Sequence, residues 1–167
     1  MISQLTKLSD GKTNNLKGDL FELAVGYYHG QLCKFLEIGK KVSSVPGQKA
    51  RDIDVLAVYE GNVVAVECKG YNYPVDKSYV EKWLGEIVPT IRDWMINSYP
   101  KKTQSFEIWS TGGFSPEALE LLKKAQLSTK KYSINFFEKT DIFEKARALE
   151  SSKFIEILKE YYFKDQP

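Results

Sequence analysis

Apolar residues recur along the chain at helical and strand spacings, which predicts an alternation of helices and strands. From Leu16 to about Phe35 they return at steps of three and four residues, which indicates an amphipathic helix. Two runs rich in β-branched residues, 53–59 and 63–68, flank Glu60-Gly61-Asn62 and predict a β-hairpin. Three further strands are predicted, at 35–38, 106–110 and 132–137, with loops at 42–49 and 71–76. A helix is predicted at 77–99, which Pro89 kinks or splits, and another from Ser115 to about Ala125. A last helix or helix pair starts with a capping box at Asp141 and Glu144 and ends near Phe163.

This order of elements predicts an α/β fold with one mixed sheet and helices on both faces. The chain of 167 residues has the length of one ordinary domain and contains no internal repeat. We expect residues 1–14, which are mostly polar, to form a flexible N-terminal segment and residues 15–167 to form a single domain.

Composition narrows the chemistry. The net charge of +2 excludes a polybasic tail for nucleic acid, although it leaves room for a local basic groove. Two cysteines and the single His29, which we expect on the polar side of the first helix, argue against a zinc site, so any metal would be a hard cation bound by oxygen. No signal peptide or membrane-spanning stretch is evident, and we expect a cytoplasmic protein with no membrane partner.

The hairpin carries the informative charges. If its turn consists of Glu60 and Gly61 alone, Asp54 lies opposite Glu67, and Asp52 lies opposite Lys69. Directly opposed residues share a face of the sheet, with their Cβ atoms about 5 Å apart. The sequence therefore predicts two carboxylates and a lysine gathered at one end of the hairpin.

Two carboxylates so placed repel each other, and a bound cation would reverse that interaction. Mg²⁺ or Mn²⁺ suits one or two carboxylates completed by water and substrate phosphate, and Lys69 beside them can hold a water or offset negative charge. The alternative is that these are solvated surface charges without a function. The apolar run 63–66 favours the first interpretation, because it places the charges at the end of a mostly buried strand.

Asp54, the hairpin and Glu67-Cys68-Lys69 together resemble the PD-(D/E)XK nuclease superfamily, which has the restriction-endonuclease-like fold. The segment 18–22 (GDLFE) is similar to the Gly-x-x-x-Glu of its first helix, and 109–118 (WSTGGFSPEA) is similar to a strand, turn and helix of Mrr-like restriction endonucleases. The resemblance spans roughly residues 16–137. A departure is Ile53, which stands where the motif has proline.

The resemblance implies a role for each matching residue. Asp54 and Glu67 would be metal ligands, and the backbone carbonyl of Cys68 would be a third ligand while its side chain lies in the core. Lys69 would position or activate the attacking water, and Glu22 would reach the metal directly or through water. Asp52 competes with Asp54 as the ligand, and we prefer Asp54 because it is matched in register to Glu67.

Other residues are candidates for nucleic-acid contact. Thr111 and Gly112, before a helix start, could cradle a phosphate, although a tight structural turn explains them equally well. Lys77 and Tyr71 follow the site in sequence and could line a substrate groove, or simply be solvated and packed residues. The segment Gly11-Lys12-Thr13 resembles the end of a P-loop, but no strand precedes it, and we expect no nucleotide cofactor.

These features favour a Mg²⁺- or Mn²⁺-dependent nuclease that hydrolyses DNA, with an endonuclease expected. A homodimer would supply two sites for two strands. Two alternatives stay open: a non-catalytic nucleic-acid-binding or assembly module that retains the fold, and a structural domain in which the charges have no role.

Overall fold

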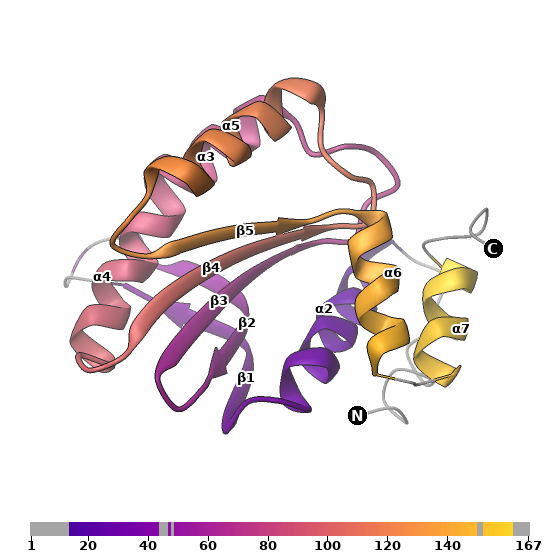
Figure 1. The fold of residues 1–167 in the computed structure, drawn as a ribbon, viewed down its shortest axis with the longest axis horizontal. Coiled ribbons are helices and arrows are strands. Elements are labelled where there is room, and N and C mark those ends of the chain that lie inside the picture. The colour runs from indigo at the N-terminus through magenta and orange to yellow at the C-terminus, as the bar shows by residue number, and fades with distance from the viewer. Residues whose placement is uncertain (1–13, 44–46, 48, 150–151, 162–167) are drawn as a thin grey trace.

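The structure, a computed structural model, describes residues 14–43, 47, 49–149 and 152–161. Figure 1 shows a five-stranded sheet between two groups of helices. Of the predicted flexible segment 1–14, only Asn14 is among the described residues, and the first helix begins there. In chain order the elements are α2 (Asn14–Gly30), β1 (Phe35–Val42), β2 (Arg51–Val58), β3 (Asn62–Lys69), α3 (Lys77–Lys82), the π-helical segment η1 (Trp83–Ile87), α4 (Val88–Ser98), β4 (Thr103–Ser110), α5 (Pro116–Ser128), β5 (Ser133–Phe137), α6 (Lys139–Ala148) and α7 (Ser152–Tyr161).

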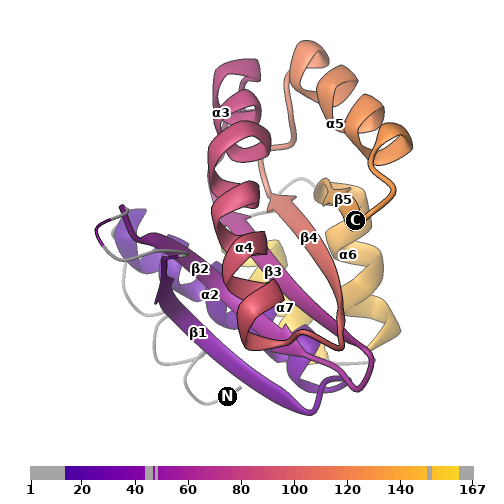
Figure 2. The same cartoon turned by 90° about the vertical axis from the view of Figure 1, so that its left-hand side faces the viewer.

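The strands keep their chain order across the sheet, β1-β2-β3-β4-β5. The β1–β2 and β2–β3 pairs are antiparallel, whereas β3–β4 and β4–β5 are parallel. Each parallel step needs a crossover, which α3, η1 and α4 provide for the first and α5 for the second. These helices cover one face of the sheet, and α2, α6 and α7 cover the other (Figures 1 and 2). The predicted mixed α/β sheet with helices on both faces is confirmed.

A separate hydrophobic core lies on each face of the sheet. The first core, under α3, η1, α4 and α5, has Trp83 and Phe106 among its largest buried side chains. The second core, under α2, α6 and α7, is built around Phe21 and Trp109. Among the described residues, no helix is both long and apolar enough to cross a membrane.

The hairpin has the register that the sequence predicts. The N–H of Tyr59 donates to the carbonyl of Asn62 at 2.8 Å, so the turn consists of two residues. The ladder then pairs Val58 with Val63 and continues to Val55 and Val66. The ammonium of Lys102 donates to the carbonyl of Tyr59 at 2.6 Å and so holds the turn from the side of β4.

The long helix predicted over 77–99 is present, but a π-helical turn just before Pro89 divides it into α3 and α4. Proline has no N–H to donate to the preceding turn, and that turn forms as the π-helical segment η1 between α3 and α4. The hydroxyl of Thr90 donates to the carbonyl of Glu86 at 3.0 Å, which provides that carbonyl with a donor. The helix therefore continues through the proline with an altered hydrogen-bond pattern.

Two predicted helix boundaries are wrong. The first helix ends at Gly30 rather than near Phe35, because the chain turns back there: the N–H of Cys33 donates to the carbonyl of His29, and Leu32 is 60% exposed. The last helix pair begins at Lys139 rather than after Asp141. Asp141 serves as the third residue of the capping box, where its carboxylate accepts from the backbone N–H of Glu138 at 3.0 Å.

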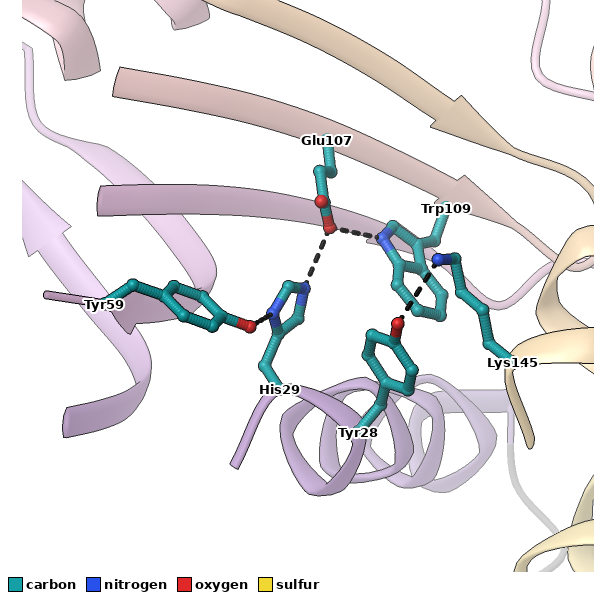
Figure 3. Close-up of polar contacts among 6 residues, drawn as sticks. All are labelled: Tyr28, His29, Tyr59, Glu107, Trp109 and Lys145. Atoms are coloured by element: carbon teal, nitrogen blue, oxygen red, sulfur yellow. Dashed lines mark hydrogen bonds and ion pairs between the residues drawn. The ribbon is translucent and has the colours of Figure 1, made fainter. Parts of the chain in front are cut away.

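His29 is buried, contrary to its predicted place on the polar side of the first helix. Its Nε2 lies 2.8 Å from the carboxylate of Glu107 on β4, and its Nδ1 lies 2.7 Å from the hydroxyl of Tyr59 (Figure 3). His29 thus connects the hydroxyl of Tyr59 with the carboxyl group of Glu107. Glu107 also accepts from the indole N–H of Trp109 at 2.9 Å. The helical pattern could not reveal this, because Glu107 lies far away in sequence.

Lys145 on α6 extends this polar group toward the C-terminal helices. Its ammonium lies 3.4 Å from the hydroxyl of Tyr28 on α2 (Figure 3) and 4.3 Å from the ring centre of Phe137. A cation above aromatic faces is attracted to them even where water is scarce. Lys145 therefore ties α6 to α2 across the second core.

Replacing His29 should destabilise the protein. We expect His29→Leu to lower the free energy of unfolding by about 2 kcal/mol, because it removes one of the two side chains, His29 and Trp109, that contact the mostly buried carboxylate of Glu107. Urea denaturation followed by circular dichroism measures this. Lys41→Met, which removes the exposed ion pair with Asp52, is the control and should change stability by less than about 0.5 kcal/mol. Equal effects of the two substitutions would contradict the importance of the buried pair.

Candidate functional site

A cavity of about 740 Å³ opens where β2 and β3 separate. Their ladder ends at Val55 and Val66, although β2 begins at Arg51 and β3 runs on to Lys69. Between these two strand ends lies the cavity, while β2 stays paired with β1 and β3 stays paired with β4 on their other sides. The start of α2 and the loop after β3 complete its lining.

The regular alternation of β2 breaks at Asp54. Ile53 packs in the first core and Val55 in the second, although side chains two positions apart on a regular strand share a face. The β1–β2 pairing omits the pair of Gly39 and Asp54, and Gly39 has a φ of 73°, which glycine adopts without strain. Asp54 thus lies at a local distortion, which directs its carboxylate sideways toward β3.

Asp54 is held by the backbone of β3. Its Oδ2 accepts from the N–H of Cys68 at 2.8 Å. The carboxyl of Glu22 comes from α2, on the face of the sheet that holds the second core, and lies close enough to Asp54 for each group to affect the pKa of the other. Two acidic side chains from distant parts of the chain therefore meet at this point.

Glu67 and Lys69 form a second group in the same cavity. The ammonium of Lys69 lies 3.0 Å from Oε1 of Glu67, and both side chains are nearly buried. The hydroxyl of Tyr79 on α3 donates to the same oxygen at 2.7 Å, while the ammonium of Lys69 lies 4.1 Å from the centre of its ring. Tyr79 therefore fixes the positions of both charged side chains.

Burial and mutual repulsion set the ionisation of the acids. Burial, and then the charge of Glu67, raise the pKa of Asp54 to about 8, against the hydrogen bond from Cys68. Burial also raises the pKa of Glu22. Burial alone would lower the pKa of Lys69, but the adjacent carboxylate of Glu67 outweighs it and raises that pKa. Glu22, Asp54 and Glu67 thus outnumber Lys69, the basic group that lies among them.

The donor set fits a hard divalent cation. Among the described residues, no three histidine, cysteine or acidic side chains are already arranged as a metal cluster. Magnesium does not require one, since it binds through one or two carboxylates and keeps several waters. Asp54 and Glu67 supply such oxygens at the two sides of the strand gap, and Glu22 is close enough to Asp54 to act through water.

Cys68 has the orientation that its predicted role requires. The carbonyl of Lys69 accepts from the N–H of Thr111 beyond β4, so the alternation of peptide groups turns both polar groups of Cys68 toward β2 and Asp54. The thiol packs against the second core, and its burial raises its pKa well above the ordinary value. The carbonyl is therefore the group of Cys68 that can face a cation.

Of the four residues predicted to contact nucleic acid, one lines the cavity and three do not. Tyr71 lines the cavity, whereas Lys77 lies outside the lining and pairs with Glu81 at 3.8 Å. Thr111 is buried, and its hydroxyl donates to the carbonyl of Tyr71 at 2.7 Å. A Cβ on Gly112 would lie 2.2 Å from a backbone oxygen of the neighbouring loop. The phosphate cradle predicted at Thr111 and Gly112 is thus replaced by a structural turn, because its groups already serve the loop after β3.

Several residues of the cavity were not found from the sequence. Lys49 and Arg51 line it beside β2, and Asp19 lines it from α2, with Tyr79 from α3. The guanidinium of Arg51 also lies 3.2 Å from the carboxylate of Glu86. Asp52 borders the cavity but is exposed and pairs with Lys41, so Asp54 is the better ligand of the two. The position of Lys49 and Arg51 directly before Asp52 and Asp54 could have predicted that these two basic residues border the site.

Removing the ionisable group of Asp54 should stabilise the metal-free protein. The raised pKa, about 8, means that Asp54 takes up a proton on folding at pH 7, which costs free energy because the unfolded chain prefers the ionised acid. Asparagine avoids this cost and can still accept from Cys68, so Asp54→Asn should raise the melting temperature in EDTA at pH 7 by about 3 °C. Mg²⁺ should raise the melting temperature of the wild type and leave the variant nearly unchanged, because only a ligand that binds the folded state stabilises it. Differential scanning fluorimetry measures both. A lower melting temperature for Asp54→Asn in EDTA would show that the carboxylate itself stabilises the hairpin end.

The comparisons with known proteins bear on the fold alone. No protein family model matches the sequence, and no curated protein matches it. The structure is similar to the crystal structure of AF1548, described as a protein of unknown function, with a TM-score of 0.52 and 11% sequence identity. The similarity covers 78% of this chain and 67% of AF1548. At this identity the two chains share a fold, and the function must be argued from the residues of the cavity.

Proposed function

We propose that this chain is a Mg²⁺-dependent nuclease domain with a restriction-endonuclease-like fold, which hydrolyses phosphodiester bonds in DNA. One observation carries the proposal: Glu22, Asp54, Glu67 and Lys69, from three separate elements, border one cavity at the end of a buried hairpin. The repulsion between these buried acids is relieved either by a proton on Asp54, whose pKa is raised to about 8, or by a bound cation. A function in binding a metal explains why the fold brings them together.

Each residue has a role consistent with its surroundings. Asp54, Glu67 and the carbonyl of Cys68 would hold the metal, and Glu22 would act on it directly or through a water. When bound, Mg²⁺ supplies activation of water and neutralisation of charge on the phosphate. Lys69 donates from an ammonium that Glu67 and Tyr79 hold in place, so it can orient the attacking water and stabilise negative charge that develops on the phosphate.

DNA would approach through the open edge of the cavity, where basic side chains gather. Lys49 and Arg51 border it, and phosphates are bound mainly by such residues. Cleavage of both strands of a duplex would need a second site, which a homodimer would provide.

The nuclease assay uses plasmid and single-stranded DNA with Mg²⁺, Mn²⁺ or EDTA. We expect cleavage with either metal and none with EDTA. Glu67→Gln and Lys69→Met should each lower the rate at least about a hundredfold, because the first removes the charge of a proposed metal ligand and the second removes the ammonium that would stabilise the charge of the transition state. Asp52→Asn, an acid two positions from Asp54 on the same strand, is the matched control and should keep the rate within about twofold.

The other outcomes separate the alternatives. DNA binding without cleavage by the wild type would favour a non-catalytic module. Neither binding nor cleavage would leave the charges without a nucleic-acid function. Loss of activity in Asp52→Asn alone would mean that the wrong acid of β2 has been assigned.

A further inference from the structure

Tyr71 and Tyr73 form an exposed, stacked aromatic pair beside the cavity. Their ring centres lie 4.8 Å apart and their planes differ by 10°. Tyr71 is 40% exposed and Tyr73 is 59% exposed. Tyr73 stays more than half exposed although Tyr71 stacks on it. The stacked rings therefore present an aromatic surface to water, to which a flat ligand could stack.

The loop that carries the pair is held in place by its backbone. The N–H of Val75 donates to the carbonyl of Gly113, and its carbonyl accepts from the N–H of Ser115, both at 2.9 Å. The hydroxyl of Thr111 bonds the carbonyl of Tyr71 at 2.7 Å. Gly112 allows the close approach, since a Cβ there would collide with the backbone of Tyr73. The two rings are therefore presented by an ordered loop, which lowers the entropy that binding would cost.

Lys69 connects the pair to the proposed catalytic groups. Its ammonium lies 3.0 Å from Glu67 and 5.6 Å from the ring centre of Tyr71. Successive phosphates of one DNA strand are about 3.4 Å apart along a duplex axis and farther apart when the strand is extended. The rings thus lie within reach of a nucleotide next to one whose phosphate is at Lys69 and Glu67.

We infer that Tyr71 and Tyr73 form a stacking platform for an unpaired nucleobase. This base would lie next to the phosphate that is cleaved, so the substrate would be single-stranded or locally melted DNA. The inference rests on the proposed function. A base within a duplex has both faces covered by its neighbours, whereas an unpaired base can place a face on Tyr73. Stacking accepts any base, so this contact selects strand structure rather than sequence.

The test measures binding to three labelled ligands in EDTA by fluorescence anisotropy. They are an oligo-dT strand, an abasic strand of equal length, and a blunt duplex. The abasic strand has the same phosphates without bases. We expect the wild type to bind oligo-dT about tenfold more tightly than the abasic strand, the size expected of one base stacked on an aromatic ring.

Tyr73 is the better position for substitution, because it does not contact Lys69. Tyr73→Ala should weaken binding of oligo-dT about tenfold and leave binding of the abasic strand unchanged, while Tyr73→Phe should keep the wild-type affinity. Phe35→Ala is the matched control: Phe35 is 52% exposed, but it pairs with Val58 at the opposite end of the sheet from the cavity. Circular dichroism confirms that the variants fold.

The outcomes distinguish this inference from the function on which it rests. Metal-dependent cleavage together with equal affinity for oligo-dT and the abasic strand, or an unaltered Tyr73→Ala, would overturn the platform and leave the nuclease. Tighter binding to the duplex than to oligo-dT would do the same. An absence of both binding and cleavage would overturn the nuclease and the platform with it. Weaker binding of oligo-dT by Phe35→Ala equal to that of Tyr73→Ala would also overturn it.

Discussion

The backbone N–H of Cys68 is the group on which the geometry of the candidate site depends. If the β2–β3 ladder continued past Val55 and Val66, the carbonyl of Ile53 would accept from that N–H. The strands have separated there, and the carboxylate of Asp54 accepts instead. A buried N–H without an acceptor costs about 1–3 kcal/mol, so the carboxyl of Asp54 offsets part of the cost of its own burial by accepting from Cys68. The separation that opens the cavity thus also fixes its most perturbed carboxylate.

The rest of the fold compensates for this unfavourable arrangement. Val63 and Ala65 of β3 anchor the hairpin in the first core, while Val64 and Val66 anchor it in the second, so the strand is clamped from both faces immediately before Glu67. Glu22 comes from a helix on one face and Tyr79 from a helix on the other. The site therefore depends on both layers of helices, and damage to either core would be expected to misplace its acids. Local strain supported by a well-packed scaffold is typical of functional sites.

Local rules predicted what local interactions decide. The Glu60-Gly61 turn gave the register, because a two-residue turn leaves one way to pair the strands, and apolar spacing gave the mixed sheet. His29 was misplaced because its partner Glu107 comes from a distant strand. Thr111 was considered for phosphate binding because its partner is not near it in the sequence: its hydroxyl donates to the carbonyl of Tyr71, in the loop after β3. These two predictions failed because the hydrogen-bond partner lies far away in the chain, whereas the two wrong helix boundaries were errors of a few residues in local capping.

The two rims of the cavity differ in chemistry, and the order of the strands explains how. Lys49 lies just before β2 and Arg51 is its first residue, and β2 lies on one side of β3. Tyr71 and Tyr73 belong to a loop that packs against the turn after β4, on the other side of β3. A nucleic-acid strand has the same asymmetry, with charged phosphates along one side and flat bases along the other. A strand laid across the end of β3 with its bases toward the tyrosines would turn its phosphates toward the basic rim. The acids of the site would then lie beneath the nucleic-acid backbone, between the basic residues and the tyrosines. One arrangement of the substrate therefore satisfies the basic, acidic and aromatic groups together, which is a stronger argument for a nucleic acid than any of the three groups provides alone.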